Sequence, residues 1–271
     1  MMSQSEVLIG DGAVLLELQD GVARLHLNRP EASNGLDIPT LQDLQTALLR
    51  CHGDRRVRVV LLTGGGVNFC AGGDVRTFLT KGEDLPEYVR QATLLLQAAI
   101  SAMIHLDAPV VAAVQGFAAG GGGMGLVCAA DIVFAAESAS FLAGATRVAM
   151  APDAGLSVTL PRLVGPRNAA HMLLMNPVVS ASEALALGLI NQVVSDAELQ
   201  GVALAYAQRL AEGAPCALAA TKRLLWSGVG LGVDAAMPEE SRTVAALCRT
   251  ADVREGLTAV VEKRRARFEG C

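Results

Sequence analysis

Asp153 is the residue of this sequence best suited to acid–base chemistry. It lies in the stretch AMAPDAGLSVTLPR (149–162) and is the only acid between Glu137 and Glu183, with small and apolar neighbours. An apolar setting raises the pKa of a carboxyl group and makes its carboxylate a better base. The alternative is a turn residue after Pro152, with its side chain bonded to nearby backbone. The residues alone leave both interpretations open.

Two glycine-rich turns could supply a complementary electrophilic site. They read TGGGVNFCAGGD (63–74) and VQGFAAGGGGMG (114–125), and each follows an apolar segment typical of a buried strand. Glycine lets the backbone approach a ligand closely, and backbone N–H groups can face a developing negative charge. A helix beginning in the second turn would add its dipole. The alternative is that these glycines only turn the chain.

A dinucleotide-binding fingerprint is the competing interpretation of the second turn. Gly120, Gly122 and Gly125 fit GxGxxG after a strand. That motif requires an acid about 20 residues later, at the end of a second strand. The nearest acids, Asp131 and Glu137, come too early, so this function is disfavoured.

Composition narrows the class of protein further. The 271 residues are 52% hydrophobic, 18% charged and only 3% aromatic, with a net charge of −5. Such a chain can bury a large core of Ala, Val and Leu, whereas a nucleic-acid surface would need clustered Lys and Arg. Six cysteines and four histidines without ligand-like spacing predict no metal site. The N-terminus has no signal-peptide pattern, so we expect a cytoplasmic protein.

The elements that would position these residues alternate between strand and helix. Residues 108–130 are uncharged and long enough to cross a membrane, but their glycines favour a strand, a turn and a helix instead. The alternation predicts an α/β domain with mostly buried strands. We expect strands at 13–19, 22–27, 57–64, 109–114 and 131–136, and helices at 36–54, at 88–105 and from near Gly123.

The pattern changes to successive helices from about residue 181. These segments are separated by glycine and proline signals. We therefore predict an α/β core at 1–195 and a C-terminal helical region at 196–271.

Six segments in order resemble motifs of the enoyl-CoA hydratase/isomerase (crotonase) superfamily. They are LNRPEASNGLD, NFCAGGDV, APVVAAVQGFAAGGGGMGLVCAADIVFAAESASF, PDAGLSVTLPRLVG, SASEALALGLINQVV and EGLTAVVEKRRARF. The resemblance spans nearly the whole chain. It implies an α/β fold, a crotonase-like spiral of ββα units with a C-terminal helical oligomerisation region that forms a homotrimer or a dimer of trimers. It also implies an acyl-CoA substrate, with coenzyme A as part of the substrate and no separate cofactor.

The resemblance assigns an oxyanion hole to backbone N–H groups of the two glycine turns. The first donor is Gly73. Between Val114 and Asp131 this sequence has one residue more than the usual pattern of the family. The second donor is therefore Gly122 when counted back from Asp131, or Gly121 when counted forward from Val114. We prefer Gly122, because an extra residue fits a loop more easily than the helix that follows. Each such donor can contribute about 10²–10³ in rate.

The resemblance also bears on which reaction is catalysed. Hydratases of the superfamily use two glutamates, which would fall at Met124 or Gly125 and at Ala145. None of these is acidic. The PDxG setting of Asp153 instead resembles enoyl-CoA isomerases and ring-opening epoxyphenylacetyl-CoA isomerases, which carry a single acid/base carboxylate. We therefore predict an acyl-CoA isomerase that moves a double bond or rearranges a ring, with Asp153 as proton shuttle.

Other activities of the superfamily remain as alternatives. They are hydration by a non-standard site, dehalogenation or thioester hydrolysis with Asp153 as nucleophile, and a non-catalytic acyl-CoA-binding or RNA-binding relative. Dehalogenases add a histidine and aromatic residues in the helix before the PV strand, where this chain has ATLLLQAAISAMIHLDAPV. The resemblance further implies coenzyme contacts at Arg29, Ser33, Ala71, Asp74, Val75, Gly121, Lys263 and Phe268. A contact across a subunit boundary is open to Lys263 and Phe268.

Overall fold

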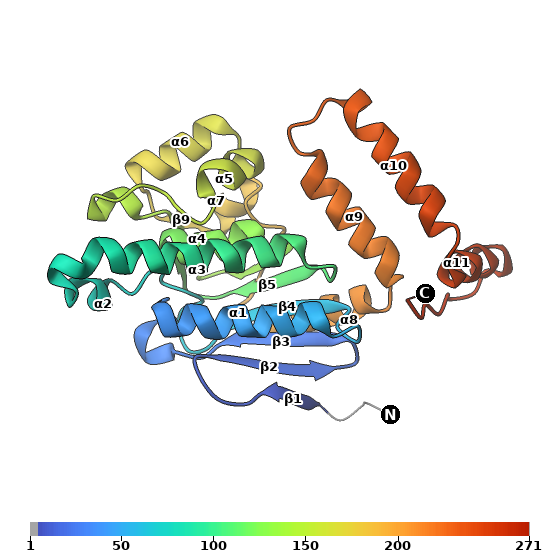
Figure 1. Cartoon of the computed structure of the whole chain (residues 1–271), viewed down its shortest axis with the longest axis horizontal. Coiled ribbons are helices and arrows are strands. Elements are labelled where there is room, and N and C mark those ends of the chain that lie inside the picture. Colours follow the sequence, from blue (N-terminus) through green and yellow to red (C-terminus); the bar gives the residue numbers. More distant parts are fainter. Residues whose placement is uncertain (1–4, 271) are drawn as a thin grey trace.

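The computed structural model describes residues 5–270, and a seven-stranded sheet forms its centre (Figure 1). The spatial order is β1-β2-β3-β4-β5-β7-β10. The first three strands are antiparallel, and β3, β4, β5, β7 and β10 are parallel neighbours. The strands are β1 (Glu6–Ile9), β2 (Val14–Gln19), β3 (Val22–Leu27), β4 (Val59–Gly64), β5 (Val110–Val114), β7 (Ile132–Ala136) and β10 (Gln192–Val194).

Helices cover both faces of this sheet. In Figure 1, α1 (Ile38–Gly53) and α3 (Leu85–His105) lie side by side in front of it. Helix α8 (Leu199–Ala211) contacts β3, β4, β5 and β7 on the other face. Helix α1 begins where the Asp37 side chain accepts a hydrogen bond from the Thr40 N–H at 2.9 Å, as an N-cap should. Because β3, β4, β5, β7 and β10 are parallel, their carboxyl ends meet at one edge of the sheet. Ligands of α/β proteins bind at this edge.

A smaller layer stands at that edge. Its three-stranded sheet contains β6 (Phe117–Ala119), β8 (Ser140–Leu142) and β9 (Val179–Ser180). Helix α4 (Gly120–Ala129) contacts this sheet, α3 and α5. The remaining elements here are α2 (Val75–Leu79), α5 (Leu156–Val164), α6 (Pro166–Met175), α7 (Ala181–Ala186) and the short 3-10 helices Pro30–Ala32, Gly82–Asp84 and Ala145–Val148.

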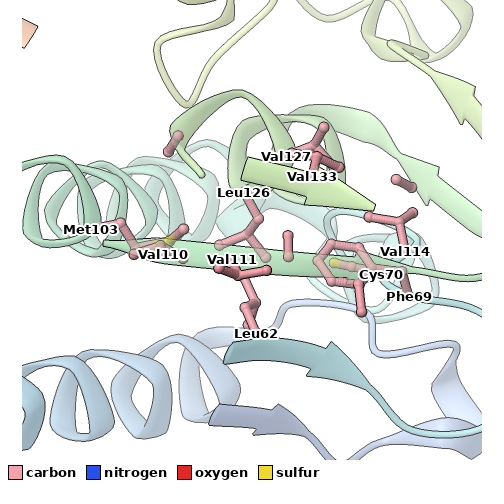
Figure 2. Packing of buried hydrophobic residues seen from close by; sticks show 14 of the residues in the cluster. Leu62, Phe69, Cys70, Met103, Val110, Val111, Val114, Leu126, Val127 and Val133 are labelled. Atoms are coloured by element: carbon pink, nitrogen blue, oxygen red, sulfur yellow. The ribbon is translucent and has the colours of Figure 1, made fainter. Parts of the chain in front are cut away.

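The core between the two layers is built from aliphatic side chains. Figure 2 shows Leu62, Val111 and Leu126 gathered around β5, with Phe69 as the one aromatic ring labelled among them. All four side chains are at most 1% exposed. The low aromatic content of the sequence is thus compatible with a closely packed interior.

The predicted alternation of strands and helices is confirmed, with one correction. Residues 108–130 form β5, β6 and α4, and no helix within residues 5–270 is long and apolar enough to cross a membrane. However, α4 begins at Gly120 rather than near Gly123. Glycine is a poor helix former, but this turn is packed against neighbouring backbone, and tertiary packing outweighs intrinsic propensity.

The C-terminal helices stand beside the sheet (Figure 1). They are α9 (Pro215–Gly228), α10 (Val233–Leu247) and α11 (Ala251–Glu262). The buried Lys222 ammonium joins α9 to the core, because it lies 2.8 Å from the Asp131 carboxylate and donates to the Met103 carbonyl at 2.8 Å. The boundary proposed at residue 195 falls just before α8, which packs on the sheet.

Candidate active site

The two glycine-rich turns lie against each other at the carboxyl edge of the sheet. The Cys70 N–H donates to the Phe117 carbonyl at 3.0 Å, and the Ala119 N–H donates to the Cys70 carbonyl at 2.8 Å. These bonds pair the loop that follows β4 with β6, through the bridge between Cys70 and Ala118. Gly73 and the start of α4 are thereby held side by side.

Gly72 permits this close approach. Its φ is +89°, in the left-handed region, and a Cβ atom there would lie 2.6 Å from the Ala119 carbonyl oxygen. Only glycine tolerates both conditions. The next peptide is fixed from the other side, because the Leu36 N–H donates to the Gly72 carbonyl at 2.7 Å and the Leu36 carbonyl accepts from Asp74 at 3.3 Å. The Gly73 N–H takes part in neither bond.

The start of α4 supplies further N–H groups. Ala119 is its N-cap, so Gly120, Gly121 and Gly122 form its first turn. N–H groups of a first turn have no acceptor within their own helix, and the helix dipole makes that end favourable for negative charge. Gly73, Gly121 and Gly122 all line the same cavity. The arrangement can therefore accommodate an oxyanion between the two turns.

Asp153 enters the cavity from a strained turn before α5. Ala154 and Gly155 have φ values of +50° and +77°, and a left-handed conformation is unusual for alanine. Burial raises the pKa of the Asp153 carboxyl above its usual value, and a hydrogen bond from its own backbone N–H partly offsets this rise. The carboxylate thus has the character expected of a general base.

The glycines of α4 allow this turn to lie directly on the helix. A Cβ atom on Gly121 would stand 1.4 Å from Asp153 Oδ1, and one on Gly125 would stand 2.5 Å from the Ala154 Cβ. Residues four apart share one face of a helix. One bare face of α4 therefore receives both the carboxylate and the alanine that follows it.

The cavity measures about 280 Å³ and is mostly apolar. Helix α3 contributes Val89, Ala92 and Leu96 to its wall. Among residues 5–270, Asp153 is the one carboxylate that lines it, and Arg147 is the one cation. An acyl chain can be buried here with one acid/base group beside it.

The positions that match the glutamates of hydratases carry no carboxylate. Ala145 lines the cavity. Met124 is completely buried, and a side chain on Gly125 would collide with Ala154. The space that a first glutamate would need at residue 125 is thus filled by the turn that carries Asp153.

The predicted coenzyme contacts are distributed unevenly around this cavity. Ala71 and Val75 line it. Asp74 caps α2 by accepting from the Thr77 N–H at 3.1 Å. Arg29 lies 3.0 Å from the Asp37 carboxylate and 3.4 Å from that of Asp74. The Ser33 carbonyl accepts from the Ala71 N–H at 2.9 Å, so Ser33 supports the loop.

Lys263 and Phe268 lie elsewhere, at the C-terminal end of the chain. Lys263 ends α11 with a φ of +55°, and the Phe268 carbonyl accepts from Arg58 at 2.9 Å. Neither lines the cavity within this chain. A larger hollow of about 960 Å³ includes Phe268, but its charged side chains pair with one another, as in Arg264 with Glu255.

Two residues of this region are not identified by the sequence patterns. Arg147 lines the same cavity as Asp153, and Asn34 is buried and bonded to the first glycine turn. The Asn34–Gly35 dipeptide is a strong turn signal, which could have drawn attention to Asn34. Nothing in the local sequence indicates Arg147.

The chain is similar over nearly its whole length to known proteins. Residues 17–271 match the profile of the family described as enoyl-CoA hydratase/isomerase. A Rhodobacter capsulatus protein named "Probable enoyl-CoA hydratase" is 38% identical, with 94% of this chain and 96% of that protein covered. The crotonyl-CoA hydratase of Syntrophomonas wolfei is 33% identical, with 94% and 97% covered.

Solved structures agree with the sequence comparison. An enoyl-CoA hydratase from Polaromonas sp. JS666 superposes with a TM-score of 0.90 at 30% identity, covering 95% of this chain and 100% of that one. This chain therefore belongs to the enoyl-CoA hydratase/isomerase family, with the α/β fold of the crotonase superfamily.

Proposed function

We propose that the protein is an acyl-CoA isomerase that moves a double bond, or rearranges a ring, through an enolate of the thioester. The observation that carries this proposal is the lone carboxylate of the cavity. Asp153 faces the glycine turns from an apolar wall, and neither hydratase position holds an acid. A shift of a double bond needs one base, because the proton that leaves one carbon returns to another.

For a 3-enoyl-CoA the steps are as follows. The Asp153 carboxylate removes a proton from the carbon next to the thioester carbonyl, and the electron pair of that C–H bond delocalises into a dienolate. N–H groups of Gly73 and Gly122 bind the thioester oxygen while it carries the negative charge. The Asp153 carboxylic acid then returns its proton to the γ carbon, which yields the 2-enoyl-CoA and restores the carboxylate.

The experiment that tests this proposal follows hydrogen exchange at the α and γ carbons of a 3-enoyl-CoA in D₂O. Wild type is expected to exchange and isomerise. Asp153→Asn is expected to bind the thioester and do neither. The matched control is Asp234→Asn, a change of the same kind on the exposed surface of α10. Equal rates in wild type and Asp153→Asn would show that Asp153 is a turn residue and not the acid/base group.

Hydration is the second candidate, because the similar proteins described above are named hydratases. Product analysis of the same reactions decides between them. Hydration would convert a 2-enoyl-CoA into a 3-hydroxyacyl-CoA without double-bond migration. It would require a water molecule activated by a group other than the two usual glutamates.

We propose further that coenzyme A binds along the Ala71–Val75 backbone at the mouth of the cavity. Arg29 and Ser33 would support that binding surface from beneath. Lys263 and Phe268 would then reach a coenzyme only in a neighbouring subunit, which agrees with a homotrimer or a dimer of trimers. Sedimentation of the full chain, with and without an acyl-CoA, tests this assembly.

A further inference from the structure

We propose that Asn34 is a positioning residue that sets the first oxyanion donor, Gly73. This inference rests on the proposed function, because it concerns the same oxyanion hole. Asn34 is 1% exposed and has a φ of +53°. Burying an amide is unfavourable unless its polar groups are hydrogen-bonded, so the hydrogen bonds of Asn34 identify what it stabilises.

The side chain of Asn34 gathers the loop that follows β4. Its Nδ2 group lies 2.9 Å from the Gly65 carbonyl, 2.8 Å from that of Asn68 and 3.0 Å from that of Phe69. Two N–H bonds are thus shared among three carbonyl oxygens. The Oδ1 atom accepts from the Arg29 N–H at 2.8 Å. All of the hydrogen-bonding capacity of the amide is therefore directed to backbone, and none to the cavity.

The backbone on either side of Asn34 continues this attachment up to Gly73. The Ser33 carbonyl accepts from Ala71, and both backbone groups of Leu36 bond to the peptides that flank Gly73. The Asn34 carbonyl also accepts from the Cys70 thiol at 3.2 Å. Residues 33–36 thus run alongside residues 70–74, and Asn34 secures the preceding loop to the same segment.

Loss of the Asn34 amide should change the position of the oxyanion donor more than the binding of the substrate. An oxyanion donor acts only when its N–H group meets the oxygen at hydrogen-bond distance. Displacement of a reacting group by about 1 Å can lower a rate by about 10²-fold. Loss of the Asn34 amide removes the bonds that anchor residues 33–36 to the carbonyls of residues 65, 68 and 69. Residues 33–36 and the Gly72–Asp74 backbone bonded to Leu36 then shift together. The Gly73 N–H changes direction while the cavity walls on α3 remain in place.

The test compares Asn34→Gly with Asn176→Gly. Glycine adopts a left-handed φ without strain, so each change removes only the side chain. Asn176 is a matched control, since it is 2% exposed with a φ of +49°. Its amide donates to the Thr146 hydroxyl, in the short helix on another wall of the cavity.

Two readouts separate positioning from a general loss of structure. For Asn34→Gly we expect kcat to fall by about 10²-fold with KM nearly unchanged. We also expect the carbonyl stretching frequency of bound butyryl-CoA, measured by infrared difference spectroscopy, to return toward its solution value. Asn176→Gly should retain the wild-type frequency. If Asn34→Gly does not fold, Asn34→Ser removes the two amide donors without burying a charge, and the same frequency change is expected.

Two outcomes would overturn the assignment. In the first, Asn34→Gly retains the wild-type kcat and carbonyl frequency. In the second, both glycine variants lose activity equally while the frequency stays at the wild-type value, which would indicate a purely structural role. Butyryl-CoA has no double bond to move, so the frequency comparison stands even if wild type proves not to be an isomerase. Absence of exchange in wild type would refute the proposed function separately.

Discussion

Gly121→Ala should inactivate the enzyme without destabilising it. The added methyl carbon would stand 1.4 Å from Asp153 Oδ1 and 2.5 Å from its Cγ. Non-bonded atoms in contact are separated by roughly 3.5 Å. The carboxylate must therefore retreat by about 2 Å, because the helix backbone that carries the methyl group is held by buried neighbours.

The size of the effect follows from that retreat. A misplacement of about 1 Å can cost about 10²-fold in rate, so we expect kcat for isomerisation to fall by at least about 10²-fold. The free energy of unfolding should rise or stay unchanged. Alanine is a better helix former than glycine by up to about 1 kcal/mol, and the φ of Gly121 is not positive.

The assay pairs isomerisation kinetics with urea unfolding of the same preparations. Gly201→Ala is the matched control, because Gly201 lies within α8 and no atom stands within 4 Å of its Cβ position. That variant should gain about 1 kcal/mol of unfolding free energy and retain full activity. A Gly121→Ala enzyme with the wild-type kcat would show that the Asp153 carboxylate is not used at the position described here.

Two further predictions concern charge. First, burial raises the Asp153 pKa, so kcat should rise with pH through a value above 3.8, the usual value for aspartate. The free energy of unfolding of wild type should fall over the same pH interval, because the folded state binds the Asp153 proton more tightly than the unfolded state. Asp153→Asn should therefore be more stable than wild type at neutral pH and equally stable below the unfolded-state pKa. A difference in urea unfolding that does not change with pH would contradict this. Second, Lys222→Met should lower the free energy of unfolding by about 3–5 kcal/mol. The Asp131 carboxylate and the carbonyls of Met103 and Ala108 then lose their buried partner. The double variant Lys222→Met, Asp131→Leu should recover part of that loss in the same unfolding assay.

The sequence contains most of the information on the fold because its strands are short, apolar and separated by glycine. The hairpin of β2 and β3 follows from alternation around Asp20–Gly21, and β4 and β5 follow from uninterrupted Val and Ala. The start of α4 could not be located in this way. Four consecutive glycines carry no periodicity, and only the packing of Gly72 and Asp153 against them explains why they are helical.

The residues of the candidate site likewise differ in whether local sequence or only long-range packing identifies them. Asp153, Gly73 and Gly122 could be proposed as site residues because each lies in a segment that resembles a motif of the family. The role of Asn34 could not, because its partners are carbonyl groups 31 to 35 residues away. Backbone carbonyls leave no trace in side-chain patterns. A residue whose function is to hold backbone is therefore visible only after the chain has folded.

The site also explains how one scaffold can hold different acid–base groups. The proposed oxyanion donors are backbone N–H groups, so they do not depend on which side chains line the rest of the cavity. The acid–base groups are side chains, and the first hydratase position and Asp153 compete for the same surface of α4. At residue 125 a glutamate would have to displace Ala154, and Ala154 is fixed by the turn that presents Asp153. A carboxylate on α4 at that position and a carboxylate at residue 153 are therefore mutually exclusive in this chain. Steric competition with Ala154 therefore bears on the first of the two hydratase positions; the second, Ala145, lies in the 3-10 helix Ala145–Val148 and is not part of it.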